Sequence, residues 1–78
     1  MLKYKNITGS SSIVGYSSGM SYIEIYYDNG YVFKYTEESI GKTHLEELKR
    51  LAELGFGLND YIKTHCYNKH ASREKYKK

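Results

Sequence analysis

Cysteine and histidine side chains near the C-terminus are the first candidates for chemistry in this chain. Cys66 and His70 are four residues apart, so a continuous helix would place both on one face, with His65 adjacent and His44 free to fold over them. Structural zinc sites need four well-placed ligands, and the chain contains neither a CxxC nor an HxxxH motif. The simpler interpretation is a half-buried cysteine and surface histidines. We therefore predict no metal site.

Nucleophilic or acid–base catalysis has equally little support in the residue pattern. Cys66 follows His65 directly, and consecutive residues on a helix point about 100° apart, so the two do not form a dyad. The serines at positions 10–12 have no evident general base nearby in the sequence. The glutamates are numerous, but nothing in their spacing indicates a general acid–base pair. Gly55-Phe56-Gly57 has the spacing of an anion-binding loop, but a helix stop explains it more simply. We predict a protein that is not an enzyme, has no catalytic residue and uses no cofactor.

A charge asymmetry indicates where a polyanion would bind. Residues 1–62 carry six basic and eight acidic side chains, whereas residues 63–78 carry six basic side chains and one acidic side chain. Aromatic side chains on a sheet face can stack bases, and basic residues beside them can contact phosphates. We predict a binding module for RNA or another single-stranded nucleic acid, formed by an outward tyrosine and lysine sheet face and a basic tail. The predicted contact residues are Tyr22, Tyr26, Lys34, Lys63, Lys69, Arg73, Lys75, Lys77 and Lys78.

A protein-interaction module is the alternative function for the same surface. Outward tyrosines on a small sheet also cover one another or meet a partner protein, and basic chain ends are often simply solvated. Under this alternative the chain is a small accessory or inhibitor protein, or it forms a homodimer through a sheet edge without binding nucleic acid. Ten tyrosines in 78 residues fit either function, and they fit a compositional bias equally well.

The composition also gives an expectation for cellular location. A single cysteine excludes an internal disulfide, which fits a reducing compartment. The first residues contain no apolar segment typical of a signal peptide, and no apolar run approaches ~18 residues. We predict a cytoplasmic protein with no membrane partner.

The element that must position the candidate residues is a β-hairpin over residues 22–35. Two alternating aromatic and β-branched runs flank Asp28-Asn29-Gly30, which is a strong hairpin signal. A two-residue turn would mix charges into both faces, so we predict a three-residue turn with Gly30 in the left-handed bulge position. This register pairs Ile23 with Tyr35, Ile25 with Phe33, Glu24 with Lys34 and Tyr27 with Tyr31. One face is then apolar or aromatic, and the other carries Tyr22, Glu24, Tyr26, Val32 and Lys34.

Shorter segments complete the expected sheet. Residues 13–16 form a strand that Ser17-Ser18-Gly19 turns back, and the glycine and serines of residues 8–12 form a loop. Residues 1–7 fit either an edge strand or an ordered arm. Residues 36–39 leave the sheet through a helical turn.

Two helices are expected to cover the apolar face of the hairpin. Thr43 and Glu46 fit a capping box, so the first helix should run from residue 44 to 54, with Gly55 as its stop. Asn59 is then the expected cap of a second helix. The first helix should bury Leu45, Leu48, Leu51 and Ala52 and pair Glu46 with Arg50 and Lys49 with Glu53, and the second should contain Tyr61, Ile62 and Cys66.

These elements predict an α+β fold, in which a small antiparallel meander of about three strands is covered by one or two C-terminal helices. We predict that residues 1–67 form the single domain. Residues 68–78 lack apolar periodicity, so we expect them to be a basic, flexible C-terminal tail.

Several short segments follow one another in a characteristic order: Ser11-Ser12-Ile13-Val14-Gly15-Tyr16, Ile23-Glu24-Ile25, Asn29-Gly30, Phe33-Lys34-Tyr35, Gly55-Phe56-Gly57-Leu58-Asn59 and Ile62-Lys63. Their order resembles the KTSC domain, a small family found at the C-terminus of some lysyl-tRNA synthetases and as stand-alone bacterial or phage proteins. The similarity covers roughly Ser11 to Tyr67. RNA binding has been suggested for that family, which has no agreed active site, so the resemblance implies RNA as a partner and no catalytic residue. Phe33, Glu53 and Gly57 depart from the family pattern, which has tyrosine, serine and an aromatic residue at these places.

Overall fold

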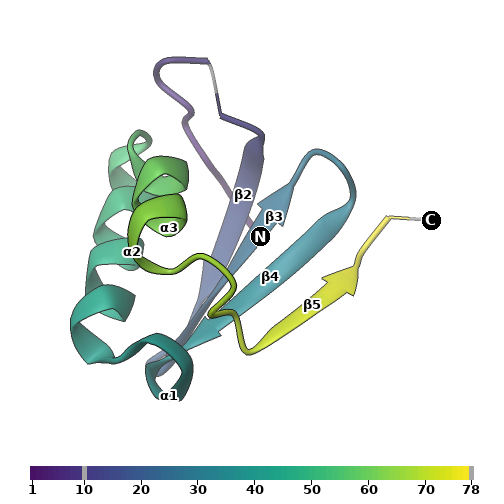
Figure 1. Ribbon diagram of the computed structural model, residues 1–78. Coiled ribbons are helices and arrows are strands. Elements are labelled where there is room, and N and C mark those ends of the chain that lie inside the picture. Colours follow the sequence, from purple (N-terminus) through teal and green to yellow (C-terminus); the bar gives the residue numbers. More distant parts are fainter. Residues whose placement is uncertain (10, 78) are drawn as a thin grey trace.

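A five-stranded antiparallel sheet, in the order β1-β2-β3-β4-β5, forms one layer of the protein, and the helices form the other (Figure 1). The computed structural model describes residues 1–9 and 11–77. This arrangement confirms the α+β class and the antiparallel meander, with two more strands than the three expected and a third, short helix. The elements are β1 (Leu2–Lys3), β2 (Ile13–Ser18), β3 (Tyr22–Tyr27), β4 (Tyr31–Thr36), α1 (Glu37–Ile40), α2 (Lys42–Leu54), α3 (Leu58–His65) and β5 (Ser72–Lys75).

The β3–β4 hairpin has the register that segregates its charges. Ile25 lies opposite Phe33, Ile23 opposite Tyr35 and Glu24 opposite Lys34, as predicted. In the turn, the Gly30 amide donates to the Tyr27 carbonyl at 3.1 Å, and the Asn29 side chain accepts from the Tyr31 amide at 3.0 Å. Side chains alternate between the two faces of a strand, so this register decides which face meets the helices.

The hydrophobic core lies between the helices and the β2–β3 half of the sheet. Ile23 and Ile25 are fully buried beneath Leu45 and Leu48, and the predicted apolar face of α2 is confirmed. Each such side chain contributes about 1.5–3 kcal/mol when it leaves water. The core is formed by Tyr4, Ile13, Tyr16, Ile23, Ile25, Tyr35, Ile40, Leu45, Leu48, Leu51, Ala52, Leu58, Ile62 and Cys66.

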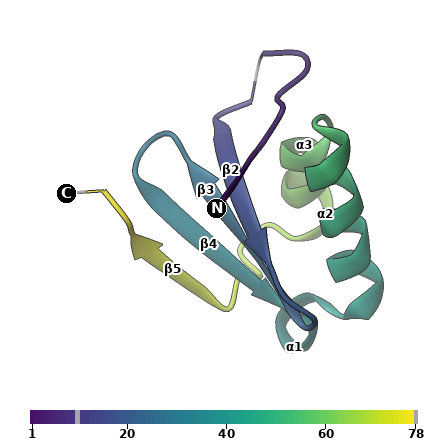
Figure 2. The same cartoon turned by 180° about the vertical axis from the view of Figure 1, so that it is seen from behind.

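The helical layer leaves the β4–β5 side of the sheet partly uncovered. Figures 1 and 2, which view the molecule from opposite sides, both show β5 on the side of β4 away from α2 and α3. Phe33 therefore lies on the helix side of the sheet, as predicted, but remains only half-buried, whereas Tyr35 is buried.

Both predicted helix caps are wrong. Because Gly41 alone separates α1 from α2, α2 begins at Lys42 and Thr43 lies inside its first turn. The capping box occurs instead at α1, where Thr36 and Ser39 exchange side-chain and backbone hydrogen bonds at 3.0–3.1 Å. α3 begins at Leu58 rather than after Asn59, and the residue before it is Gly57. Gly57 has no side chain with which to cap the start of α3. Full burial of Leu58 fixes the first turn of α3 against the core.

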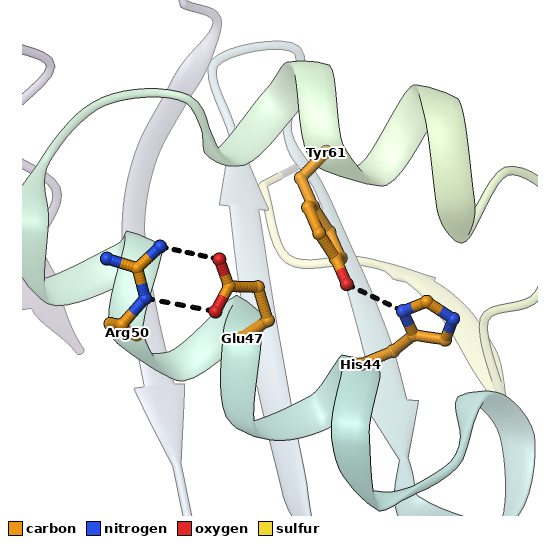
Figure 3. Close-up of polar contacts among 4 residues, drawn as sticks. All are labelled: His44, Glu47, Arg50 and Tyr61. Atoms are coloured by element: carbon orange, nitrogen blue, oxygen red, sulfur yellow. Dashed lines mark hydrogen bonds and ion pairs between the residues drawn. The ribbon is translucent and has the colours of Figure 1, made fainter.

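The end of α2 is as predicted, whereas the side-chain pairs on its exposed face are not. Gly55 does end the helix, and its amide donates to the Leu51 carbonyl at 3.0 Å. The ion pair on the exposed face, however, joins Arg50 to Glu47 rather than to Glu46. The spacing of three residues lets the guanidinium approach both carboxylate oxygens, at 3.0 and 2.5 Å (Figure 3). Lys49 donates instead to the Met20 carbonyl at 3.1 Å.

The flexible tail predicted over residues 68–78 is wrong for Ser72–Lys75, which form β5 beside β4. Backbone hydrogen bonds along the open edge of β4 order this segment, and they require no apolar periodicity. The Ala71 amide donates to the Lys34 carbonyl at 2.7 Å before the strand, and the Tyr76 amide donates to the Gly30 carbonyl at 2.8 Å after it. Lys78 lies outside the described residues.

The N-terminal segment adds the other edge of the sheet. Leu2 and Lys3 pair with Tyr16 and Gly15, so the edge-strand interpretation of residues 1–7 is confirmed for these two positions. Within the part of the chain that the structure describes, no helix is long and apolar enough to cross a membrane.

Candidate functional site

Three residues of the predicted contact set lie together on the sheet face opposite the helices. Tyr22, Tyr26 and Lys34 share this outer face through the hairpin register. The Lys34 ammonium lies 4.7 Å from the centre of the Tyr22 ring, and the Tyr26 ring meets the Tyr76 ring edge-to-face at 5.0 Å. These rings therefore already contact other side chains.

The outer face carries charges of both signs. Glu24 lies beside Lys34, and Glu74 reaches the same face because it pairs with Val32. Desolvation, followed by the nearby Glu24 carboxylate, raises the pKa of the Tyr26 hydroxyl. This face thus lacks the uniform positive charge that a polyanion would require.

The predicted basic residues are divided between the two faces of the sheet. Arg73 pairs with Phe33 and Lys75 with Tyr31, so both cations lie on the helix side rather than beside Tyr22 and Tyr26. Lys63 lies on the helix side as well, because α3 carries it there. Lys77 lies near Tyr76, Lys69 is exposed in the connection before β5, and Lys78 is outside the described residues. The predicted nine-residue surface is therefore not one surface, because β5 is a strand whose side chains alternate.

A groove lies on the helix side of the sheet, between α3 and β5, and we call it the β4–β5 groove. Its volume is about 310 Å³. No acidic side chain lines it among the residues that the structure describes. Its lining residues are Tyr27, Phe33, Tyr35, Asn59, Ile62, Lys63, Tyr67, Asn68, His70 and Arg73.

Aromatic rings form one wall of the β4–β5 groove. Phe33 contacts Tyr27 at 5.3 Å and His70 at 4.9 Å between ring centres, both nearly perpendicular. Tyr35 approaches His70 at 6.4 Å. Such edge-to-face contacts hold the rings in fixed orientations. Tyr67 is 71% exposed at the margin of the groove and extends this aromatic surface.

Positive charge surrounds these rings. The Arg73 guanidinium lies 5.2 Å from the centre of the Tyr31 ring, which holds it on the helix side of β5. Lys63 and Lys75 are exposed. Lys63 on α3 and Arg73 on β5 line the groove, and Lys75 lies two residues further along β5 on the same face.

Two tyrosine hydroxyls of the groove, those of Tyr27 and Tyr35, resist ionisation. Burial raises the pKa of Tyr27 to about 12. Burial also raises the pKa of Tyr35, with a smaller contribution from Tyr27. These two phenols therefore remain neutral hydrogen-bonding groups beside Lys63 and Arg73.

The residues first considered for metal binding or catalysis do not all share one environment. Cys66 is fully buried, and burial raises the pKa of its thiol, which disfavours the nucleophilic thiolate. His44 bonds through Nδ1 to the Tyr61 hydroxyl at 2.6 Å (Figure 3). His44 also stacks against His65, whereas His70 contacts Phe33. Among residues 1–9 and 11–77, no group of three or more His, Cys, Asp or Glu side chains could hold a metal ion.

Sequence reasoning missed the β4–β5 groove because it assigned Phe33 to a covered core and residues 68–78 to a free tail. One signal was present in the second segment. Arg73, Lys75 and Lys77 recur at every second position, which is the period of a strand with one basic face. The exposure of Phe33 had no local signal, because it depends on how far the helices extend over the sheet.

Searches against protein-family models, curated proteins and solved structures find no match to this chain. The resemblance to the KTSC domain therefore stays a prediction. The functional interpretation rests on the side chains of the β4–β5 groove.

Proposed function

We propose that the protein is a non-enzymatic module that binds single-stranded RNA, and that the β4–β5 groove is its binding surface. The observation that carries the proposal is the position of Lys63 and Arg73 in the lining of an aromatic groove that has no acidic lining residue among the described residues. Lys75 lies two residues further along β5, on the same face as Arg73. In single-stranded binding sites, basic side chains contact the phosphates while aromatic rings stack the bases. The groove supplies both kinds of contact within a few residues.

An unpaired strand fits this surface better than a duplex. Bases inside a duplex are stacked on one another, so their faces cannot reach an aromatic wall without being unpaired. The groove is close in volume to the smallest ligand pockets, which is suitable for one base rather than a helix. The KTSC resemblance agrees with this proposal, because RNA binding has been suggested for that family.

Salt dependence and two matched lysine variants test the electrostatic part of the proposal. Fluorescence anisotropy with labelled single-stranded RNA should give a log K against log salt slope of about −2, since three phosphate contacts contribute ~0.7 each. Lys75→Gln should weaken binding and reduce the slope by about 0.7. Lys3→Gln is the control, because Lys3 is an exposed strand lysine on β1, at the opposite edge of the sheet. Equal losses in the two variants would contradict the groove as the site.

Two tyrosine variants decide between the two faces of the sheet. Tyr67→Ala should lose ~1–3 kcal/mol of binding free energy, the usual contribution of one stacked base, while Tyr26→Ala should leave binding unchanged. Tyr67 is mostly exposed, so its removal should not disturb the fold. The reverse result would assign binding to the outer face predicted from the sequence.

A protein-interaction module is the second candidate, and one observation favours it. Ile7, Leu54 and Phe56 are 64%, 40% and 49% exposed, and they gather around Gly55, whose carbonyl accepts from the Ile7 amide at 2.8 Å. Exposed apolar patches often contact partner proteins. Absence of RNA binding at low salt and high micromolar protein would favour this candidate over the first.

A further inference from the structure

β5 is attached to the sheet without a fully buried side chain of its own. Ser72 is half-buried, and Arg73, Glu74 and Lys75 are exposed. Among the residues that the structure describes, the hydrophobic core contains none after Cys66. Segments with few buried apolar contacts and solvent-exposed backbone hydrogen bonds open at a lower free energy than the core does. By this criterion, β5 can undock from β4 while the core stays folded.

Tyr76 forms a latch at the end of β5. Its hydroxyl donates to the Tyr27 carbonyl at 2.6 Å, and its amide donates to the Gly30 carbonyl at 2.8 Å. Its ring lies on the outer face of the sheet, where it meets the Tyr26 ring edge-to-face. These contacts hold the end of β5 on the β3–β4 turn, and the Ala71 amide holds the beginning of the strand on β4.

Docking of β5 determines whether the β4–β5 groove is complete. Arg73 lines the groove from β5, whereas Lys63 lines it from α3. Phe33 and Tyr35 line it from β4, which is also paired with β3. Undocking of β5 would therefore remove the Arg73 guanidinium and leave the other three side chains in place.

A ligand stabilises the state that it binds more tightly. RNA in the groove contacts Arg73 only while β5 is docked, so it binds the docked state more tightly. Resting on the proposed RNA binding, we infer that RNA binding and the docking of β5 stabilise each other. Arg73 links the two events, and Tyr76 is the residue that positions the strand.

Amide hydrogen exchange of the full chain, followed by NMR, tests this coupling. Without RNA, the Ala71 and Tyr76 amides should exchange faster than those of the central strand β3, because they need only β5 to undock. A saturating concentration of single-stranded RNA should slow their exchange about 5- to 150-fold, the usual range for two coupled equilibria. Equal exchange at β5 and β3 without RNA would overturn the inference.

Two cation variants show whether Arg73 carries the coupling. Each is measured without RNA and with RNA at a concentration that saturates that variant. Lys63→Gln should weaken RNA binding but preserve the slowing of exchange, because Lys63 stays on α3 whether or not β5 is docked. Arg73→Gln should weaken binding and reduce the slowing factor toward one. Equal slowing in the two variants would overturn the role of Arg73.

Tyr76→Phe tests the latch, because it removes the hydroxyl that donates to Tyr27 and keeps the ring beside Tyr26. Without RNA, the Ala71 amide should exchange about 2- to 12-fold faster in this variant, the factor that corresponds to one net hydrogen bond. Tyr26→Phe is the control, because it removes a hydroxyl from the same face and leaves the Tyr76 bond in place. Equal acceleration in both variants would overturn the assignment of Tyr76.

The outcomes also separate this inference from the proposed function. RNA binding that leaves the exchange of the Ala71 and Tyr76 amides unchanged would overturn the coupling and leave RNA binding intact. Failure of the RNA to bind in fluorescence anisotropy at low salt would overturn the proposed function, and this inference with it.

Discussion

At the scale of single residues, the hydroxyls of Tyr27 and Tyr35 link burial to the pH dependence of stability. Tyr27 and Tyr35 flank Phe33 on the helix side of the sheet, and desolvation disfavours the ionised form of both. Both phenols line the β4–β5 groove together with Lys63 and Arg73. The same burial also makes the stability of the protein depend on pH in the alkaline range.

Stability should fall as the pH rises from ~10, where an unperturbed tyrosine ionises, to about 12, the raised pKa of Tyr27. Below this window the phenol is neutral in both states and its contribution is fully present. Within it the unfolded chain loses the proton while the folded phenol keeps it, so the contribution is lost progressively until the phenol is ionised in both states. Urea midpoints measured across this range should decline less steeply for Tyr27→Phe than for the wild type. Tyr67→Phe is the control, because Tyr67 is exposed, and an equal decline in all three proteins would contradict the assignment.

At the scale of elements, two glycines form the corner between α2 and α3, and the N-terminal segment packs closely against one of them. Gly55 and Gly57 both have left-handed backbones, with φ of +91° and +81°. A Cβ atom at Gly55 would lie 2.6 Å from Cβ of Lys5, whereas one at Gly57 would lie 3.8 Å from the nearest atom, in Leu51. The N-terminal arm therefore packs directly against the end of α2.

Alanine at these two glycines should separate backbone strain from steric contact. Both Gly55→Ala and Gly57→Ala place a side chain in a left-handed conformation, at a cost of about 1–2 kcal/mol. Gly55→Ala should cost more, because Cβ of Lys5 cannot move without its backbone. Chemical denaturation measures the difference between the two variants. Equal costs would show that the arm yields at Lys5.

At the scale of the whole molecule, the two edges of the sheet are the places where copies of the chain could pair. β1 contains only two residues, and β5 contains Arg73, Glu74 and Lys75. Short and charged edge strands oppose pairing with another sheet. This composition disfavours the edge-mediated homodimer considered from the sequence.

We expect the protein to be a monomer, with a sedimentation mass equal to one chain. Replacing charges on β5 with β-branched residues, as in Arg73→Val combined with Lys75→Val, should promote self-association, because the edge then resembles an inner strand. The same replacements on α2, at exposed Lys42 and Glu46, serve as the control. A wild-type dimer would show that the charges on β5 do not protect the edge.

Local pattern alone determined the central hairpin and the buried face of α2. Only one hairpin register satisfies the period-two alternation, the three-residue turn and the opposite charges of Glu24 and Lys34. In α2, leucines at helical spacing define one apolar face. Gly55 likewise ends α2 because a local left-handed backbone is sufficient to stop a helix. Each of these features depends on residues close together in the chain.

Tertiary structure alone decided the position of residues 68–77 and the exposure of Phe33. β5 forms because β4 offers unpaired backbone groups, and its own side chains give little apolar signal for this pairing. Phe33 remains half-buried because the helices end before they cover β4 and β5. The β4–β5 groove arises from both facts together. Contacts between distant segments therefore place Arg73 beside Phe33 and Lys75 beside Tyr31. The sequence predicted the outer face instead because it carries no local sign of these contacts.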